Sequence, residues 1–595
     1  MPRNRDVVVL QYFTPVKLNS IRGIRRSLII IGTIFLCLSH PAIAEGPQWT
    51  FEPQHFGAAL VEGGWMTSRT IAQINGSPEF TFPLQLVYLT THTQRGEFGD
   101  QWFCPQLESN LLPRGMGVLV WTQPSGGLIG LFQERGYAIL FSDRSGEWHA
   151  KITGPKTVIT NIRRASQGKL NGWEYTYNSG KLVSIQAPSG RLLEYTYTGQ
   201  KLVQVTLRDP QTGATRIVVT ITHRADGRLT GLNASGVDNQ FGYQNGPDGR
   251  LLSWQRPGMT KPDVFDYAKQ GVLASVQPGA GQPTTFQTQF AAPKDPGGKP
   301  INTPAEQAKV ANYRVTDDGV FTYVYGAEGA VTLRDKAGAS QSFDYSAKRG
   351  ASTYTDAGGQ RTQSYYYRAP GQKHDGKLRQ IVQGGVTLVE NFYEKATGNL
   401  IESIDRDGIS TYYEYGPGCD KPVRVLRGTV RKRSVVAMMK YDPAGHLIEQ
   451  TDASGKTTKF TYNGRGEPDS VTQWDGSKFM LAYDSFGHCK EIALSSDKTK
   501  ATLHQQTEYG DDGRIRRQTS PDGQTTEYAY DAGGNVSEIR RNGVLMVNTP
   551  ATNLAWSPRR RTPSGASQSS ITTSAAITLR NICQMAQRQA TNTTN

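Results

Sequence analysis

The histidines, cysteines and acids of this sequence lack the spacings that catalytic and metal sites usually show. None of the nine histidines belongs to an H-E-x-x-H motif or to another close histidine pair. No two cysteines have C-x-x-C spacing, which argues against a zinc or redox motif. Acids recur along the whole chain, so no carboxylate pair stands out for glycosidase chemistry. We therefore predict no catalytic, cofactor-binding or metal-binding residues and no enzymatic activity, with a hydrolase site in residues 45–165 as the alternative.

Two recurring features invite a chemical interpretation, and each also has a structural one. Asp-x-x-Gly pairs suggest calcium, but they lack the dense Asp/Asn ladder of a calcium loop, so capping of tight turns explains them better. His446 and His488 each follow the glycine of such a turn, and we expect both to be exposed. Aromatic rings on a sheet can stack on sugars, so carbohydrate binding is one hypothesis. The alternative is that the tyrosines pack between neighbouring hairpins.

These residues lie on a repeated unit. Five anchor tyrosines recur at intervals of 21, 21, 26 and 21 residues, each with a glycine four residues later and three with an aspartate next to them. A near-fixed period of this length is typical of repeat architectures. The predicted structural anchors are Tyr441, Asp442, Gly445, Tyr462, Gly466, Tyr483, Asp484, Gly487, Tyr509, Gly513, Tyr530, Asp531 and Gly534.

Each unit reads as a β-hairpin. After the anchor tyrosine, the aspartate caps backbone N–H groups and the glycine takes a positive φ, which makes a tight turn. A second turn follows about ten residues later, as at 452–455, and apolar and polar residues alternate between the turns. Such a hairpin cannot bury its apolar face alone, so neighbouring hairpins must stack into one continuous sheet.

The chain divides into segments by composition. A basic start is followed by an apolar run, Leu28 to Leu38, and by an A-x-A site at Ala42 and Ala44, which predicts a cleaved signal peptide and an exported protein in the periplasm, on the cell surface or outside the cell. The apolar run is too short for a membrane span. The predicted segments are a signal peptide (1–44), a β-rich cap domain (45–165), a first repeat array (166–277), a Pro/Gly-rich linker (278–312), a second array (313–545) and a disordered tail (546–595).

The distribution of charge bears on a nucleic-acid partner, and the spacing of the cysteines bears on disulfide bonds. Of the net charge of +15, about a third lies in residues 1–26 and another third in 546–595, so the body has a mixed surface and we predict no nucleic-acid partner. Removal of a signal peptide would leave Cys104, Cys419, Cys489 and Cys583, too far apart in the sequence for a dense disulfide framework. We expect isolated packed thiols, or one or two bridges.

The units that begin at Tyr441, Tyr483 and Tyr530 resemble the YD repeat of the Rhs family, with Tyr-Asp-x-x-Gly at 441–445, 483–487 and 530–534. The resemblance covers about residues 170–545. It implies an all-β fold in which repeated hairpins form a long spiralling sheet, shell-like or barrel-like, preceded here by a smaller β-rich domain. In bacterial members the shell often encloses a C-terminal toxin that an aspartyl self-cleavage element releases.

The sequence departs from toxin-bearing members after the last repeat. No core-ending cleavage motif follows Tyr530, and the tail is too short for a recognisable toxin domain. We therefore predict an exported, non-enzymatic structural or surface interaction protein, with a cell-surface carbohydrate or another surface protein as its partner. The alternative is a shell component of an Rhs-type toxin or delivery system, truncated or completed by a partner, with an encapsulated or co-assembling polypeptide.

Overall fold

The computed structural model describes most of residues 58–548. The gaps are 62–63, 90–96, 114–116, 125–127, 135–138, 143–147, 162–171, 246–248, 269–270, 281–282, 291–309, 318–320, 327–330, 336–339, 347–349, 370–371, 418–419, 430 and 496–501. The predicted signal peptide with Ala42 and Ala44, as well as residues 549–595, therefore lie outside the described residues. Apart from one short helix, α2 (Pro105–Glu108), every regular element that the structure describes is a strand. The predicted all-β fold is confirmed.

The described part of the chain starts with a small antiparallel sheet. Its strands β1 (Ala58–Val61), β2 (Gly64–Asn75), β3 (Thr81–Leu89) and β4 (Trp102–Phe103) pair in chain order. The inward side chains of β3 are fully buried, among them Phe82, Leu84 and Leu86. This alternation of apolar residues places β3 against the core of the molecule.

All later strands belong to a second sheet, in which each strand pairs antiparallel with the next along the chain. Its first part contains β5 Asn110–Pro113, β6 Val118–Thr122, β7 Leu128–Gln133, β8 Leu140–Ser142, β9 Trp148–Thr153, β10 Lys156–Asn161, β11 Glu174–Asn178, β12 Lys181–Gln186, β13 Leu192–Thr198, β14 Lys201–Arg208, β15 Thr215–His223, β16 Leu229–Ala234, β17 Val237–Tyr243, β18 Leu251–Gln255, β19 Asp263–Tyr267, β20 Leu273–Gln277 and β21 Thr284–Phe290. β12 also pairs back with β5, at Lys181 and Asn110, which closes the early strands into a barrel.

The second part of this sheet continues without a break in the order of strands. It contains β22 Val310–Asp317, β23 Phe321–Gly326, β24 Val331–Asp335, β25 Ser340–Ser346, β26 Ala351–Thr355, β27 Arg361–Tyr366, β28 Leu378–Gln383, β29 Val386–Tyr393, β30 Leu400–Asp405, β31 Ser410–Tyr415, β32 Pro422–Thr429, β33 Lys432–Tyr441, β34 Leu447–Asp452, β35 Thr457–Tyr462, β36 Pro468–Thr472, β37 Lys478–Tyr483, β38 Cys489–Ser495, β39 Thr502–Tyr509, β40 Ile515–Thr519, β41 Thr525–Tyr530, β42 Val536–Arg541 and β43 Val544–Asn548.

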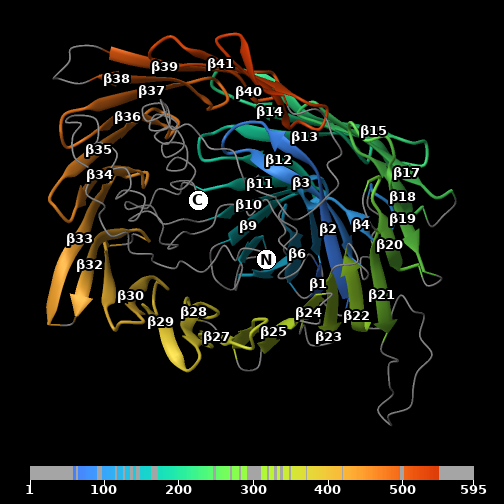
Figure 1. Ribbon diagram of the computed structural model, residues 1–595, viewed down its shortest axis with the longest axis horizontal. Coiled ribbons are helices and arrows are strands. Elements are labelled where there is room, and N and C mark those ends of the chain that lie inside the picture. Colours follow the sequence, from blue (N-terminus) through green and yellow to red (C-terminus); the bar gives the residue numbers. More distant parts are fainter. Residues whose placement is uncertain are drawn as a thin grey trace.

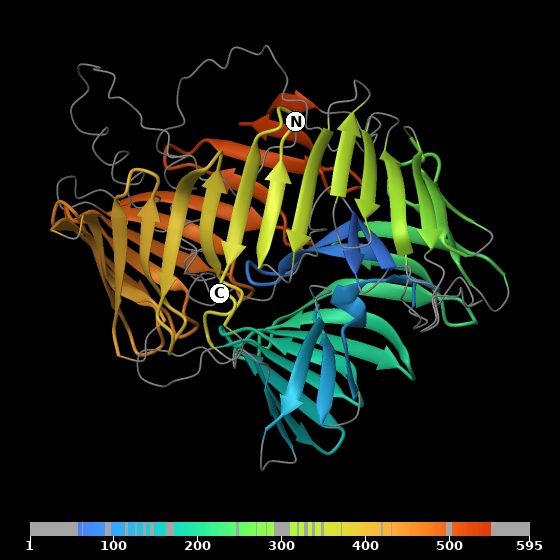
Figure 2. The same ribbon diagram turned by 90° about the horizontal axis from the view of Figure 1, so that it is seen from below.

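The sheet travels around the molecule and returns to its own beginning. In Figure 1 the strands run from β15 past β21, β27 and β33 to β40, which lies close to β13 and β14 in the same view. Figure 2 shows the early strands, coloured cyan and teal, gathered on one side of the broad curved wall that the green, yellow and orange strands form. The predicted spiralling, shell-like sheet is therefore the observed architecture.

The segment boundaries predicted inside this region do not interrupt the sheet, and β43 (Val544–Asn548) extends past the predicted start of the disordered tail at residue 546. Across residue 165, β10 pairs directly with β11. Within the predicted linker 278–312, β21 pairs with β22 from Thr285 opposite Thr316 to Phe290 opposite Val310. The reason is local, since Thr284–Phe290 is rich in threonine and phenylalanine, which favour strands, while the Pro/Gly-rich stretch 291–309 lies between the two strands and outside the described residues.

The hydrophobic core is concentrated in the first half of the chain. All the buried residues of the main apolar cluster fall between Ile71 and Phe286, and they include Trp102 and Trp121, which are fully buried. In the second half a much smaller cluster forms around Phe479 and Leu481. Within the described part of the chain, no helix is long and apolar enough to cross a membrane.

Candidate functional site at the closing seam

Each anchor tyrosine connects its own strand to the strand before it. Each hydroxyl group donates a hydrogen bond to a backbone carbonyl at the start of an earlier strand, most often 15 residues back in the sequence. These bonds join Tyr441 to Pro422 (3.1 Å), Tyr462 to Leu447 (2.7 Å), Tyr483 to Pro468 (2.7 Å), Tyr509 to Cys489 (3.1 Å) and Tyr530 to Ile515 (2.7 Å). These five tyrosines therefore contact neighbouring strands, as the packing alternative expects, and each also makes a specific hydrogen bond.

A β-bulge precedes each of these tyrosines. The strand register shifts between Lys440 and Tyr441, between Thr461 and Tyr462, and between Ala482 and Tyr483, and the same shift occurs before Tyr509 and Tyr530. A bulge bends the strand and redirects the side chain that follows it. A bulge therefore occurs directly before every anchor tyrosine whose hydroxyl group bonds to the preceding strand.

The predicted turn residues behave as expected. The carboxylate oxygens of Asp442, Asp484 and Asp531 accept hydrogen bonds from backbone N–H groups two to four residues later. All five anchor glycines have positive φ values: +86° for Gly445, +76° for Gly466, +88° for Gly487, +75° for Gly513 and +81° for Gly534. These turns form the rim of the sheet, where they meet other parts of the chain.

The prediction for His446 and His488 is wrong, because both are buried, with exposed fractions of 7% and 6%. Nδ1 of each imidazole lies 2.9 Å from the aspartate four residues earlier, Asp442 or Asp484. Each ring also stacks on an anchor tyrosine of the next repeat, at 4.7 Å from Tyr462 and 4.6 Å from Tyr509. An aspartate partner and an aromatic face compensate for the loss of water, so these turns fold inward.

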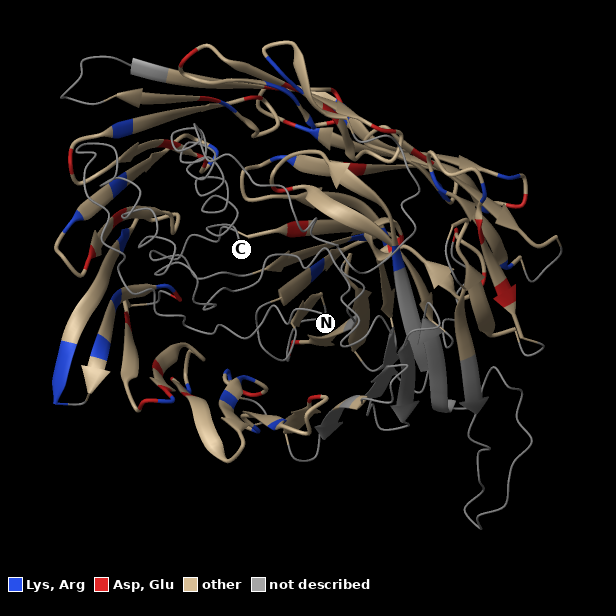
Figure 3. Cartoon of the chain, in the orientation of Figure 1, with Lys and Arg blue, Asp and Glu red and all other residues tan. Residues whose placement is uncertain are grey.

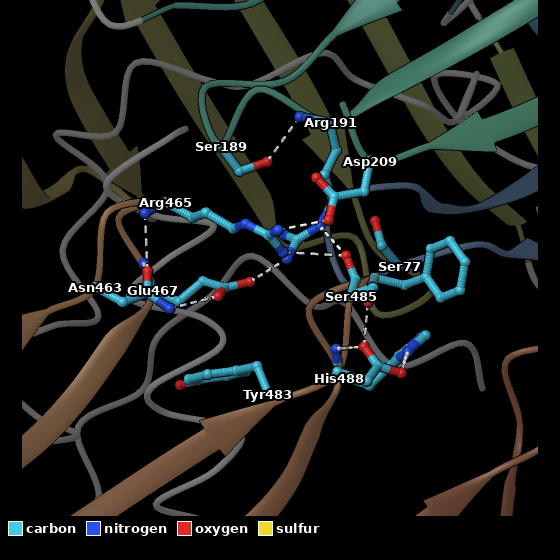
Figure 4. A network of polar contacts seen from close by, with 12 residues as sticks. Ser77, Ser189, Arg191, Asp209, Asn463, Arg465, Glu467, Tyr483, Ser485 and His488 are labelled. Atoms are coloured by element: carbon cyan, nitrogen blue, oxygen red, sulfur yellow. Dashed lines mark hydrogen bonds and ion pairs between the residues drawn. The ribbon is translucent and has the colours of Figure 1, made fainter. Parts of the chain in front are cut away.

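The last repeats meet the first repeats at a polar contact that we call the seam, shown in Figure 4. Its centre is Arg191, which precedes β13 and is 1% exposed. Its Nη2 lies 2.6 Å from Glu467, its Nη1 lies 3.5 Å from Glu79, and its Nε donates to the carbonyl oxygen of Ser485 at 3.0 Å. One buried guanidinium therefore joins the small sheet, the first repeats and the last repeats.

A second arginine strengthens the seam from the opposite side. Arg465, in the turn between β35 and β36, forms an ion pair with Asp209 and donates through Nε to Gln211 at 2.9 Å. Its Nη1 donates to the carbonyl oxygen of Ser485 at 3.2 Å, the same oxygen that Arg191 contacts. Asp209 and Arg465 are 256 residues apart in the sequence. The seam is thus held by two arginines that approach from opposite ends of the sheet.

The contact continues along the next two turns. The guanidinium of Arg216 lies 4.1 Å from the ring centre of Phe486, an arrangement that allows a cation–π interaction, and it donates to the carbonyl oxygen of Gly76 at 3.2 Å. A Cβ atom added to Gly513 would lie 1.8 Å from the carbonyl oxygen of Asn75. The repeat glycine is therefore needed here for close packing as well as for its backbone conformation.

The seam changes the acidity of its carboxylates. Burial holds the pKa of Glu79 above its usual value, although Arg191 and a hydrogen bond from Ser189 oppose this effect. For Asp209, burial also raises the pKa, but hydrogen bonds from Thr212 and the Gln211 N–H, together with Arg465, outweigh it and leave the pKa below its usual value. The arrangement is that of a fastening between distant segments of the chain.

The structure describes two of the four cysteines that follow the predicted signal peptide. Cys104 and Cys489 are free and buried, and burial raises the pKa of the Cys104 thiol strongly. Cys419 and Cys583 lie outside the described residues. Neither placed thiol belongs to the seam.

The class of protein follows from this geometry: a repeat protein whose single long β-sheet curves into a shell and is fastened where its two ends meet. The family model of the RHS repeat matches residues 441–478 and 509–544, which contain the clearest Tyr-Asp-x-x-Gly units. The chain therefore contains RHS repeats at these residues. Among curated proteins, none matches this sequence.

Several solved structures are similar at low identity. The Photorhabdus luminescens Tc holotoxin pore is 13% identical over 82% of this chain and 28% of that chain, with a TM-score of 0.36. The TcdB2-TccC3-TEV complex is 13% identical over 84% of this chain and 30% of that chain, with a TM-score of 0.36. For the TcdB2-TccC3-Cdc42 complex the identity is 14%, the shares are 80% and 31%, and the TM-score is 0.32. This chain therefore spans less than a third of the length of these chains.

Proposed function

We propose that this protein is a non-enzymatic structural component of an RHS-type shell that encloses a polypeptide. The seam carries this proposal. It fastens turns that are 254 to 294 residues apart in the sequence, and thereby holds the curved sheet against its own first strands. A sheet that served only as an extended surface for binding would not need such a fastening.

The burial of the central arginine supports the same conclusion. Removing one partner from a buried ion pair leaves an uncompensated charge, so such a pair strongly favours one arrangement of the segments that supply it. Arg191 has two carboxylate partners, Glu79 and Glu467, which come from two different parts of the chain. The closed arrangement of the wall is thus favoured over an open ribbon.

The proposal of a non-enzymatic role rests on what the candidate groups do. The histidines of the repeat turns are occupied by Asp442 and Asp484 and by ring stacking. In the cap region, Glu108 accepts backbone hydrogen bonds at 2.6 Å from both Glu97 and Cys104. These side chains have structural partners, which favours a scaffold over a catalytic site.

The setting of the shell is also part of the proposal. We place it in an exported toxin or delivery assembly, as the resemblance of the repeats to the Rhs family implies and as the signal-like sequence up to Ala44 favours. The anchor tyrosines that suggested carbohydrate stacking use their hydroxyl groups to join neighbouring strands. Enclosure therefore accounts for the repeated tyrosines better than sugar binding does.

A protection experiment tests the proposed function. An unstructured peptide rich in lysine and arginine is fused after Asn595, and its cleavage by trypsin is followed over time. We expect slow cleavage in the wild-type fusion and fast cleavage in Arg191→Met, because the methionine leaves Glu467 and Glu79 without their partner. The matched control is Arg424→Met, an exposed arginine paired with Glu414. Cleavage of the wild-type fusion as fast as that of the same peptide on an unrelated folded carrier would contradict enclosure.

A further inference from the structure

One hairpin of the sheet carries an unusual concentration of positive charge. Strands β32 and β33 form a hairpin whose pairing extends to Thr429 and Lys432. From Lys421 to Tyr441 the sequence contains seven basic residues and no acid. Figure 3 shows the blue segment at the far end of β33, at the lower left of the molecule. This feature was missed when the body of the chain was interpreted as uniformly mixed in charge.

The charges along the stem of the hairpin are neutralised by neighbouring strands. Arg424 pairs with Glu414 at 3.4 Å and Arg427 pairs with Asp405 at 2.8 Å. On β33, Lys440 pairs with Glu449 at 2.7 Å. Lys421, at the other end of the hairpin, donates to the carbonyl oxygen of Gly445 at 2.7 Å. The three remaining basic residues are adjacent, at the tip.

The tip itself consists of Arg431, Lys432 and Arg433, all exposed. Among the residues that the structure describes, no carboxylate forms an ion pair with any of the three. The guanidinium of Arg433 lies 4.0 Å from the ring centre of Tyr412, in position for a cation–π interaction. Three adjacent exposed cations at the end of a two-stranded hairpin produce a local positive potential.

We propose that this tip, residues 431–433, binds the headgroups of anionic phospholipids at a membrane surface. Three adjacent exposed cations suit an extended, negatively charged surface, because such a surface can attract all three at once. Arginine and lysine near such a bilayer are attracted by its surface potential. The inference does not depend on the proposed enclosure of a polypeptide, because it concerns the outer end of one hairpin.

Vesicle sedimentation of the full-length chain tests the proposal. Vesicles of phosphatidylcholine alone are compared with vesicles that also contain phosphatidylglycerol. The tip variant carries Arg431→Gln, Lys432→Gln and Arg433→Gln. We expect it to bind the anionic vesicles roughly 100-fold more weakly than wild type, on the basis of about fivefold per basic residue at low salt.

A matched control removes the same charge elsewhere. It carries Arg406→Gln, Lys459→Gln and Lys490→Gln, three exposed residues of the same array, and we expect it to bind within about threefold of wild type. Because both chain ends with their basic residues stay unchanged in every variant, the comparison isolates the tip. The double variant Arg431→Gln/Lys432→Gln keeps the contact between Arg433 and Tyr412 and is expected to lose roughly 30-fold, which guards against a folding defect.

Three results would overturn the proposal. The first is wild-type binding that does not depend on phosphatidylglycerol. The second is an equal loss in the tip variant and the control, which would reduce the effect to net charge. The third is tip-dependent binding to a nucleic acid or an acidic peptide without binding to anionic vesicles. Failure of vesicle binding would leave the protease-protection result of the enclosure experiment unaffected.

Discussion

The two halves of the sheet are stabilised in different ways. Up to Phe286 the strands surround one continuous apolar core, in which aromatic rings such as Trp121 are fully buried. From Ala351 onward the apolar cluster that the structure describes is small, and the regular features are hydrogen-bonded turns and tyrosine hydroxyls that join successive strands. A repeat sheet can therefore extend far beyond its apolar core. This requires that each added strand is connected to the previous one and that the last repeats are fastened to the first.

The largest expected effect of a single substitution lies in the core of the first half. Trp121 contacts the rings of Trp148 and Tyr175, and its Nε1 donates to Tyr177 at 2.6 Å. Trp121→Ala is expected to lower the free energy of unfolding by about 3–5 kcal/mol. Urea denaturation followed by circular dichroism measures this. Phe479→Ala in the small cluster of the second half should cost less, and an equal or larger cost would remove the contrast between the halves.

Two repeat glycines with the same backbone conformation allow the contribution of the seam contact to be measured separately. Gly513 has a φ of +75° and Gly523 a φ of +81°, but only a Cβ at Gly513 would collide with Asn75, since nothing lies within 4 Å of one at Gly523. Gly523→Ala should cost about 1–2 kcal/mol from its backbone conformation alone. Gly513→Ala should cost clearly more, as measured by thermal unfolding. Equal costs would show that the seam contact at Asn75 contributes nothing.

The tyrosine hydrogen bond is a smaller contribution that recurs in many repeats. Tyr462→Phe leaves the ring in place but removes the bond to the carbonyl oxygen of Leu447, and we expect a loss of about 1 kcal/mol. The control is Tyr366→Phe, a half-buried tyrosine of the same array whose hydroxyl has no hydrogen-bond partner among the described residues, with an expected change within about 0.5 kcal/mol. Chemical denaturation of both variants provides the comparison, and an undetectable loss in Tyr462→Phe would assign the tyrosine period to ring packing alone.

A carboxyl group in each half of the chain should change the stability with pH, and the two changes have opposite signs. Burial, followed by the charge of Glu97, raises the pKa of Glu108 to about 8, so its contribution to stability is present at acidic pH and is lost as the pH rises through about 8. For Asp484, burial raises the pKa, but the hydrogen bond and charge of His488 outweigh it and hold the pKa below its usual value. Its contribution is therefore present at neutral pH and lost as the pH falls below the usual aspartate range. Melting temperatures across pH should show that Glu108→Gln flattens the alkaline limb and Asp484→Asn the acidic limb, and the reverse assignment would contradict these shifts.

The sequence is sufficient to predict the repeat and its turns, because the relevant residues are close together along the chain. Tyr462 and Gly466, for example, lie in one turn, and a positive φ at the glycine is a local requirement. The burial of His446 was missed, although a usable signal exists: Asp442 lies four residues before it, and the same spacing recurs at Asp484 and His488. A histidine next to a turn glycine is usually exposed, so the aspartate decides the outcome.

The seam could not be predicted from one sequence. Arg191 stands in Pro-Ser-Gly-Arg, which resembles many exposed turns, and its partner Glu467 is 276 residues away. The β-bulges before the tyrosines are also invisible to a period-two pattern, because the additional residue lies on the partner strand. Long-range closure depends on the accumulated twist of many strands, and no local pattern records that quantity.

The most direct test of the closed shell is a double-mutant cycle across the seam. Arg465→Met, Asp209→Asn and the double variant are compared with wild type by urea denaturation, with the exposed pair of Arg424 and Glu414 as the reference cycle. We predict a coupling energy of about 1–3 kcal/mol for Arg465 and Asp209, and less than about 0.5 kcal/mol for the reference pair. A coupling energy near zero between Arg465 and Asp209 would mean that the ends of the sheet do not meet in solution, and it would contradict the closed shell.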